Sequence, residues 1–184
     1  MSRFISHLTL PFICECLLLC IPLNIYVIGD NLAEGVQWAL FRYQQSSVGN
    51  SLILIHKDIH YVAGGILKGA SASSTIIWVA GAVLLVAAAV VLALAAVQSS
   101  PGLIRPAGIL TIVTGVLFLL AEIAEYGPAL FNLHGSSLPI GVPVVLVVGL
   151  WLVFGDFRAG DENAAKPEEL PGEDVGPEPG DTAE

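Results

Sequence analysis

Charged residues are scarce in this sequence. Asp, Glu, Lys and Arg make up 12% of its 184 residues, whereas a typical soluble domain carries about 25%. Only seven residues are Lys or Arg, so the chain lacks the clustered bases that a nucleic-acid-binding surface needs. A mean hydropathy of +0.79 predicts instead a protein that meets a lipid bilayer.

Cysteine is also rare, and its placement excludes two kinds of site. Cys14, Cys16 and Cys20 all lie in the first hydrophobic run. They cannot form the disulfide framework of an exposed domain, and no second CxxC pair completes a zinc site. We interpret them as small packing residues, with S-acylation or a redox role as the alternative.

The motifs of nucleotide binding and of common hydrolases are missing as well. The chain contains no G-x-G-x-x-G, no G-x-x-x-x-G-K-[ST] and no G-x-S-x-G pattern. These absences favour a protein that binds no nucleotide and is not an enzyme.

Long apolar runs are what the sequence does contain. Residues 75–97 carry no charge and no proline, and as a helix they would extend about 34 Å, enough to cross a hydrocarbon core of about 30 Å. Small residues at helical spacing within this run predict close packing against another helix or a second copy: Ala82, Ala89, Ala93 and Ala96. We predict four spans in all, over residues 8–29, 75–97, 107–126 and 140–157.

The stretch between the first two of these spans, residues 30–74, is more polar. Leu32, Val36 and Tyr43 recur at helical spacing, which predicts an amphipathic helix over 31–45 at the membrane surface.

Residues 51–67 are apolar enough for a fifth span, but Lys57 and Asp58 would then lie at its centre. Each buried charge would cost about 2.5–3.5 kcal/mol on insertion scales. We therefore expect a second interfacial or re-entrant helix there, and keep the fifth span as the alternative.

Two acids interrupt the predicted spans. Glu15 lies in the first and Glu122 in the third, and carboxylates within a membrane often serve proton or cation transfer. They give one alternative function, an ion or proton conduit.

A second alternative is a metal-dependent membrane enzyme. His56 and His60 are four residues apart and would share a helix face. In the four-span arrangement Glu122 and Glu125 lie on the same membrane side, so these four residues could hold a metal ion at the outer rim. We expect no other cofactor.

The C-terminal residues are acidic and rich in proline. Of the net charge of −9, −8 falls on residues 156–184. Such a segment cannot bury enough apolar surface to fold, so we predict a disordered tail over 158–184 after a membrane domain over 1–157.

The positions of Arg3, Arg105 and Arg158 predict the orientation. They share one side if there are four spans, which places both termini in the cytoplasm, and we expect the plasma membrane. Arg42, Lys57 and Lys68 lie on the other side, in a longer connection that also carries acids. A fifth span would put the two termini on opposite sides.

Together these features predict an all-α integral membrane protein with four antiparallel transmembrane helices, interfacial helices between spans 1 and 2, and an acidic tail. The outline resembles the layout of tetraspanins and claudins, but it lacks the cysteine and tryptophan signatures of their loops, so the resemblance implies no function. The expected role is a small membrane partner, scaffold or assembly subunit, whose partners are the bilayer and a protein or second copy bound through span 2.

Overall fold

The computed structural model describes residues 2–29, 32–133 and 135–157. Two long helices form its main axis: α3, Gly69–Gln98, and α4, Ile104–Tyr126. They run antiparallel and are joined by a turn with the short 3-10 helix η1, Pro101–Leu103. Ser99 ends α3 in a left-handed conformation, with φ of 52°, a common way to terminate a helix.

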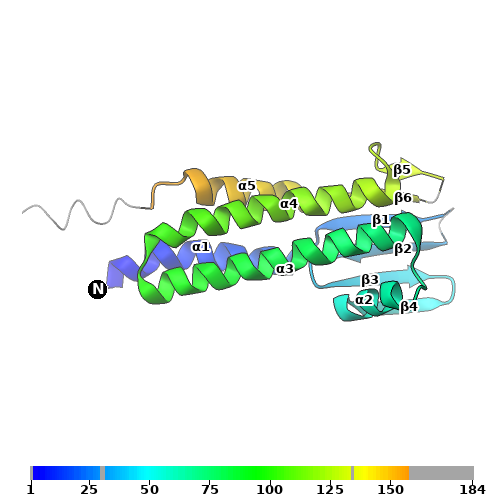
Figure 1. The fold of residues 1–184 in the computed structure, drawn as a ribbon, viewed down its shortest axis with the longest axis horizontal. Helices are drawn as coiled ribbons and strands as arrows, with labels where there is room; N and C mark the ends of the chain where they lie inside the picture. The colour runs from blue at the N-terminus through cyan, green and yellow to red at the C-terminus, as the bar shows by residue number, and fades with distance from the viewer. Residues whose placement is uncertain (1, 30–31, 134, 158–184) are drawn as a thin grey trace, which may run out of the picture.

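Two shorter helices lie beside this pair (Figure 1). α1, Ser2–Cys20, packs against α3, and α5, Val142–Phe154, packs against α4. The shared core contains Leu85 of α3, Phe118 of α4 and Val145 of α5, which are all fully buried. Trp78 of α3 stacks on Phe118 with ring centroids 4.4 Å apart, which ties the two long helices together.

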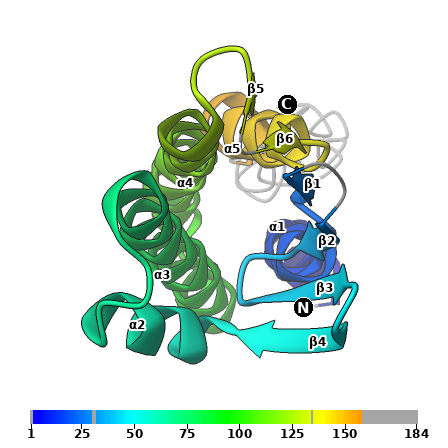
Figure 2. The same ribbon diagram turned by 90° about the vertical axis from the view of Figure 1, so that its right-hand side faces the viewer.

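A six-stranded antiparallel sheet lies at one end of the helices (Figures 1 and 2). Its strands are β1 Asn24–Ile28, β2 Ala33–Gln37, β3 Phe41–Ser46, β4 Gly49–Leu54, β5 Phe131–Asn132 and β6 Gly135–Leu138. The order is β4-β3-β2-β1-β6-β5, so the segment between α4 and α5 extends a sheet begun by the segment after α1. Helix α2, Ile55–Ala63, follows β4 directly and packs against α3.

The all-α prediction is therefore wrong. An amphipathic helix was predicted over residues 31–45, but its described part contains all of β2 and most of β3, and the end of the run 8–29 forms β1. That run is apolar throughout, and periodicity alone does not separate a buried strand from a helix. Its helix ends at Cys20, before Pro22, and three of the next strand's five residues are β-branched, which favours a strand.

The prediction of a multi-pass bundle with four membrane spans is wrong as well. Among the described residues, two helices are long and apolar enough to cross a membrane, Gly69–Gln98 and Pro101–Tyr126. The apolar parts of the other two, Thr9–Cys20 and Val142–Phe154, are shorter. Of the segment 51–67, residues up to Leu54 belong to β4, and the helix begins only at Ile55. The predicted acidic tail, 158–184, lies outside the described residues.

Candidate functional site

A polar cavity of about 420 Å³ lies between the sheet and the helices α2, α3 and α4. Side chains of β1 and β3 form one wall, and the sheet-side ends of α3 and α4 form the other. Its polar and charged lining includes Asn24, Tyr26, Arg42, Asp58, Glu122 and Glu125. Cavities of this size commonly hold small molecules in proteins.

The alternation of strand side chains explains why this wall is polar. Successive residues of a strand point to opposite faces, and in β1 and β3 the cavity face carries Asn24, Tyr26, Arg42 and Gln44. The outward face carries an apolar row of cross-strand neighbours: Leu52, Tyr43, Val36, Ile25 and Leu138. The sheet is thus polar where it faces the cavity, and its outer face carries this apolar row beside a polar row of Glu34, Gln45 and Asn50.

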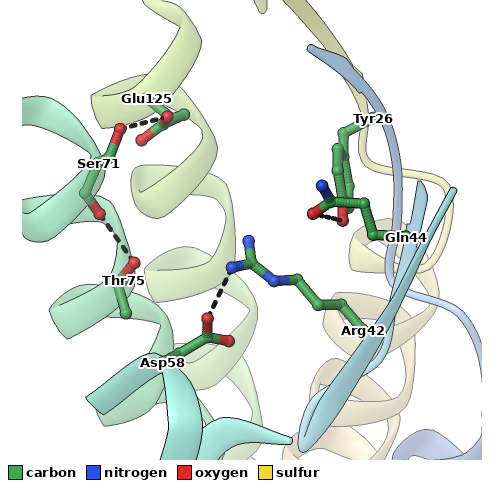
Figure 3. Close-up of polar contacts among 7 residues, drawn as sticks. All are labelled: Tyr26, Arg42, Gln44, Asp58, Ser71, Thr75 and Glu125. Carbon is green, nitrogen blue, oxygen red and sulfur yellow. Dashed lines mark hydrogen bonds and ion pairs between the residues drawn. The ribbon is translucent and has the colours of Figure 1, made fainter. Parts of the chain in front are cut away.

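Arg42 and Asp58 form an ion pair across the cavity (Figure 3). Arg42 Nη2 of β3 donates to Asp58 Oδ1 of α2 at 2.7 Å. Burial raises the pKa of Asp58 above its ordinary value, and the Arg42 charge and hydrogen bond offset part of that rise. The pair joins the sheet to α2, and α2 makes few other contacts with the sheet.

Glu122 joins α4 to the sheet. Asn24 Nδ2 of β1 donates to Glu122 Oε1 at 2.6 Å. Ser137 Oγ of β6 contacts both the other Glu122 oxygen and Asn24 Oδ1. Since a hydroxyl has a single proton to donate, a proton on Glu122 would complete a closed ring of three hydrogen bonds. The intramembrane acid predicted from the sequence is therefore a buried cross-link between helix and sheet.

Glu125 lies one turn further along α4 and is less buried than Glu122. Ser71 Oγ of α3 donates to Glu125 Oε1 at 2.8 Å, and Thr75 Oγ1 donates to the Ser71 backbone oxygen at 2.8 Å (Figure 3). These bonds place the Glu125 carboxylate on the helical wall of the cavity. Within the described residues, no Lys or Arg forms an ion pair with it.

Tyr26 completes the sheet side of the site. Its hydroxyl donates to Gln44 Oε1 at 3.3 Å (Figure 3). Its ring lies over Gly35, where an added Cβ would be 2.5 Å from Tyr26 Cζ, so only glycine fits beneath it. Burial raises the pKa of Tyr26, the Arg42 charge opposes that rise, and Asp58 and Glu122 add to it.

The histidines of the predicted metal site lie elsewhere. His56 and His60 are exposed on α2, and neither lines the cavity, whereas Glu122 and Glu125 do. In the described part of the chain, no three His, Cys, Asp or Glu side chains come together as a metal site would require. The geometry thus gives the metal hypothesis no support.

The second predicted acid, Glu15, is fully buried in α1. Thr111 Oγ1 of α4 donates to its Oε1 at 2.8 Å, and its Oε2 has no partner among the described residues. Thr111 and Glu122 are eleven residues apart on α4, which separates the two acids by about 16 Å along the helix. The structure therefore does not bring the two proposed conduit residues together.

Sequence reasoning missed most of the sheet side of the cavity. Asn24, Tyr26, Arg42 and Ser137 come from three strands that were not predicted. Only Arg42 could have been noticed from the sequence as a candidate site residue, because it is a lone base among apolar and amide residues. No known family model matches the chain, and no curated protein matches it.

Proposed function

We propose that this protein is a non-enzymatic assembly subunit that is anchored in a membrane by the helical hairpin of α3 and α4. The hairpin places the sheet at one membrane surface, where it joins a second copy of the chain through strand β4.

The apolar surface of the hairpin supports the membrane anchor and is the observation that carries the proposal. In the most apolar stretch of 18 residues, only 39% of α3 is buried within the chain. The corresponding share for the helical segment Pro101–Tyr126, which contains α4, is 44%. Large apolar side chains are exposed along both helices, among them Val83, Val90, Leu94, Val113 and Leu120. A core helix of a soluble protein would be covered on these faces, and a soluble surface would carry charge.

The positions of the bases support an orientation. Arg105 lies at the turn between α3 and α4, and the start of α1 lies at the same end (Figure 1). Bases near short loops favour the cytoplasmic side. The sheet end also carries bases, but Arg42 is neutralised by Asp58, and Lys57 and Lys68 lie on the much longer connection between α1 and α3. We accordingly propose that this end is cytoplasmic and that the sheet lies on the opposite side.

The two edges of the sheet differ, and this difference supports assembly through β4. The β5 edge is two residues long, which is too short to pair with another chain. The β4 edge is six residues long, contains no charge and no proline, and is exposed at five of its six positions. Proteins usually protect a free edge with a charge, proline or a bulge, so an unprotected edge favours strand pairing.

A second copy is the occupant that this edge suits best. Two β4 strands related by a two-fold axis would pair antiparallel, and the same residues would serve on both sides. The pairing would also make one continuous row from the apolar side chains on the outer faces of the two sheets, because the row in each copy ends at Leu52 of β4. The alanines Ala82 and Ala89 of the predicted span 2 interface are instead buried inside the chain.

The test is the oligomeric state of the full chain in lipid nanodiscs, measured by light scattering. We expect a dimer for the natural protein and a monomer for Leu52→Lys, because a charge on the edge blocks strand pairing. Leu133→Lys is the matched control, since Leu133 is 97% exposed near the other edge and should leave the dimer intact. A natural chain that is monomeric, or that purifies with a different protein instead of itself, would contradict the proposal.

A further inference from the structure

The charge of the cavity is not balanced. Four charged side chains line it: Arg42, Asp58, Glu122 and Glu125. Arg42 and Asp58 neutralise each other in their ion pair. Glu122 is bound by Asn24 and Ser137, which are both neutral, and Glu125 by the neutral hydroxyl of Ser71. Since a protonated Glu122 is neutral, the carboxylate left without a positively charged partner among the described residues is that of Glu125, and a positively charged ligand would offset its charge.

The aromatic residues that line the cavity indicate which class of cation it would bind. Tyr26, Trp78 and Tyr126 all contribute to the walls, and each is buried. Aromatic faces attract organic cations such as ammonium groups. Carboxylates combined with aromatic walls thus fit an ammonium ion that carries an apolar body.

The size of the cavity and the spacing of its ligands argue against a bare metal ion. A volume of about 420 Å³ is far larger than a coordinated metal needs, and it suits a small organic molecule. Metal coordination would also require several converging ligands, and the described residues contain no group of three.

We infer that this cavity binds a small organic ammonium ion, with its charged nitrogen at Glu125 and its apolar body against Tyr26 and Tyr126. Glu125 is the contact residue because it is the less buried of the two α4 acids. Glu122, one turn away, is instead held by Asn24 and Ser137 of the sheet. This inference depends on neither the membrane anchor nor the β4 dimer, so it can fail or succeed separately from them.

The first test uses the natural protein and a matched pair of probes, choline and its neutral analogue 3,3-dimethyl-1-butanol. The two probes have the same shape and differ in the charge at one atom. Titration calorimetry on the full chain in detergent should show choline binding at least tenfold more tightly, which corresponds to about 1.4 kcal/mol. Equal affinities, or no binding of choline up to about 10 mM (about 2.7 kcal/mol of affinity), would overturn the inference.

The second test locates the site. Glu125→Gln keeps an oxygen that can accept the Ser71 hydrogen bond but removes the charge, and should weaken choline binding about tenfold or more. Glu34→Gln removes a carboxylate from an exposed position on the outside of β2 and should leave binding unchanged. Equal losses in the two variants would mean that choline responds only to the overall charge, and would contradict a specific cavity site. The probe comparison on the natural chain remains decisive even if Glu125→Gln fails to fold.

Discussion

At the scale of single residues, the cavity depends on charges held by neighbours that are distant in sequence. Arg42 and Asp58 are 16 residues apart and meet only because β3 and α2 fold onto the same cavity. Glu122 is held by residues 98 and 15 positions away. The sequence does mark Glu15, Glu122 and Glu125 as unusual, because a carboxylate in an apolar run is costly. It does not reveal Asn24 or Ser137, whose residue types are common in turns.

The raised pKa of Asp58 leads to a prediction about pH. Between its ordinary pKa of 3.8 and its raised folded-state pKa, the folded chain holds a proton that the unfolded chain has lost. Asp58 thus contributes most stability at low pH, and that contribution is lost as pH rises through the folded-state value. The melting temperature of the natural chain should therefore fall relative to that of Asp58→Asn as pH rises above 3.8.

Circular dichroism melting in detergent measures this difference. Glu34→Gln, at an exposed carboxyl on the outer side of the sheet, is the control, and its melting temperature should not follow the pH trend of Asp58→Asn. The opposite result would be a melting temperature of the natural chain that rises relative to that of Asp58→Asn as pH rises. It would show that the ion pair with Arg42 outweighs the effect of burial on the pKa of Asp58.

At the scale of elements, the helices approach closely at glycines. An added Cβ at Gly149 of α5 would lie 2.7 Å from Ile112 Cγ1 and 2.9 Å from the Ile112 backbone nitrogen of α4. Gly108 of α4 meets Leu152 and Val153 of α5 in the same way. Small residues at such contacts let helix backbones pack closely, which is how helices associate where lipid gives no competing hydrophobic gain.

Enlarging one of these glycines should separate α4 from α5. We expect Gly149→Leu to lower stability by about 1–3 kcal/mol, because a backbone atom stands in the way and cannot rotate aside as a side chain can. Unfolding in mixed micelles of rising denaturing-detergent content measures the loss. Val147→Leu is the control on the same helix, at a position 64% exposed, and an equal loss there would contradict close packing as the cause.

At the scale of the whole molecule, charged side chains are absent from the middle of the two long helices and gather at the sheet end. The middle of α3 and α4 exposes apolar side chains, whereas the sheet end holds the cavity and the polar contacts drawn in Figure 3. This division is what a protein with one part in lipid and one part in water would show.

A charge placed on the apolar helix surface distinguishes lipid from water. Val113 lies at mid-height of α4 and is 42% exposed. If it faces lipid, Val113→Arg should cost about 2.5–3.5 kcal/mol and reduce membrane insertion, whereas on a soluble surface it would be tolerated. Resistance to alkaline extraction from membranes measures insertion. Leu133→Arg, at the sheet end, should insert normally, and normal insertion of Val113→Arg would refute the membrane anchor.

The sequence by itself determined the low charge, the apolar helices that became α3 and α4, and the unusual acids, because composition and unbroken apolar runs are local properties. The tertiary structure alone decided that β1 to β4 form a sheet, since a strand makes its hydrogen bonds to neighbouring strands and not within itself. β1 needs both β2 and β6, which lie on either side of the helical hairpin in sequence. The cavity follows from that pairing, because only the folded sheet brings Arg42 and Tyr26 to face Glu122 and Glu125.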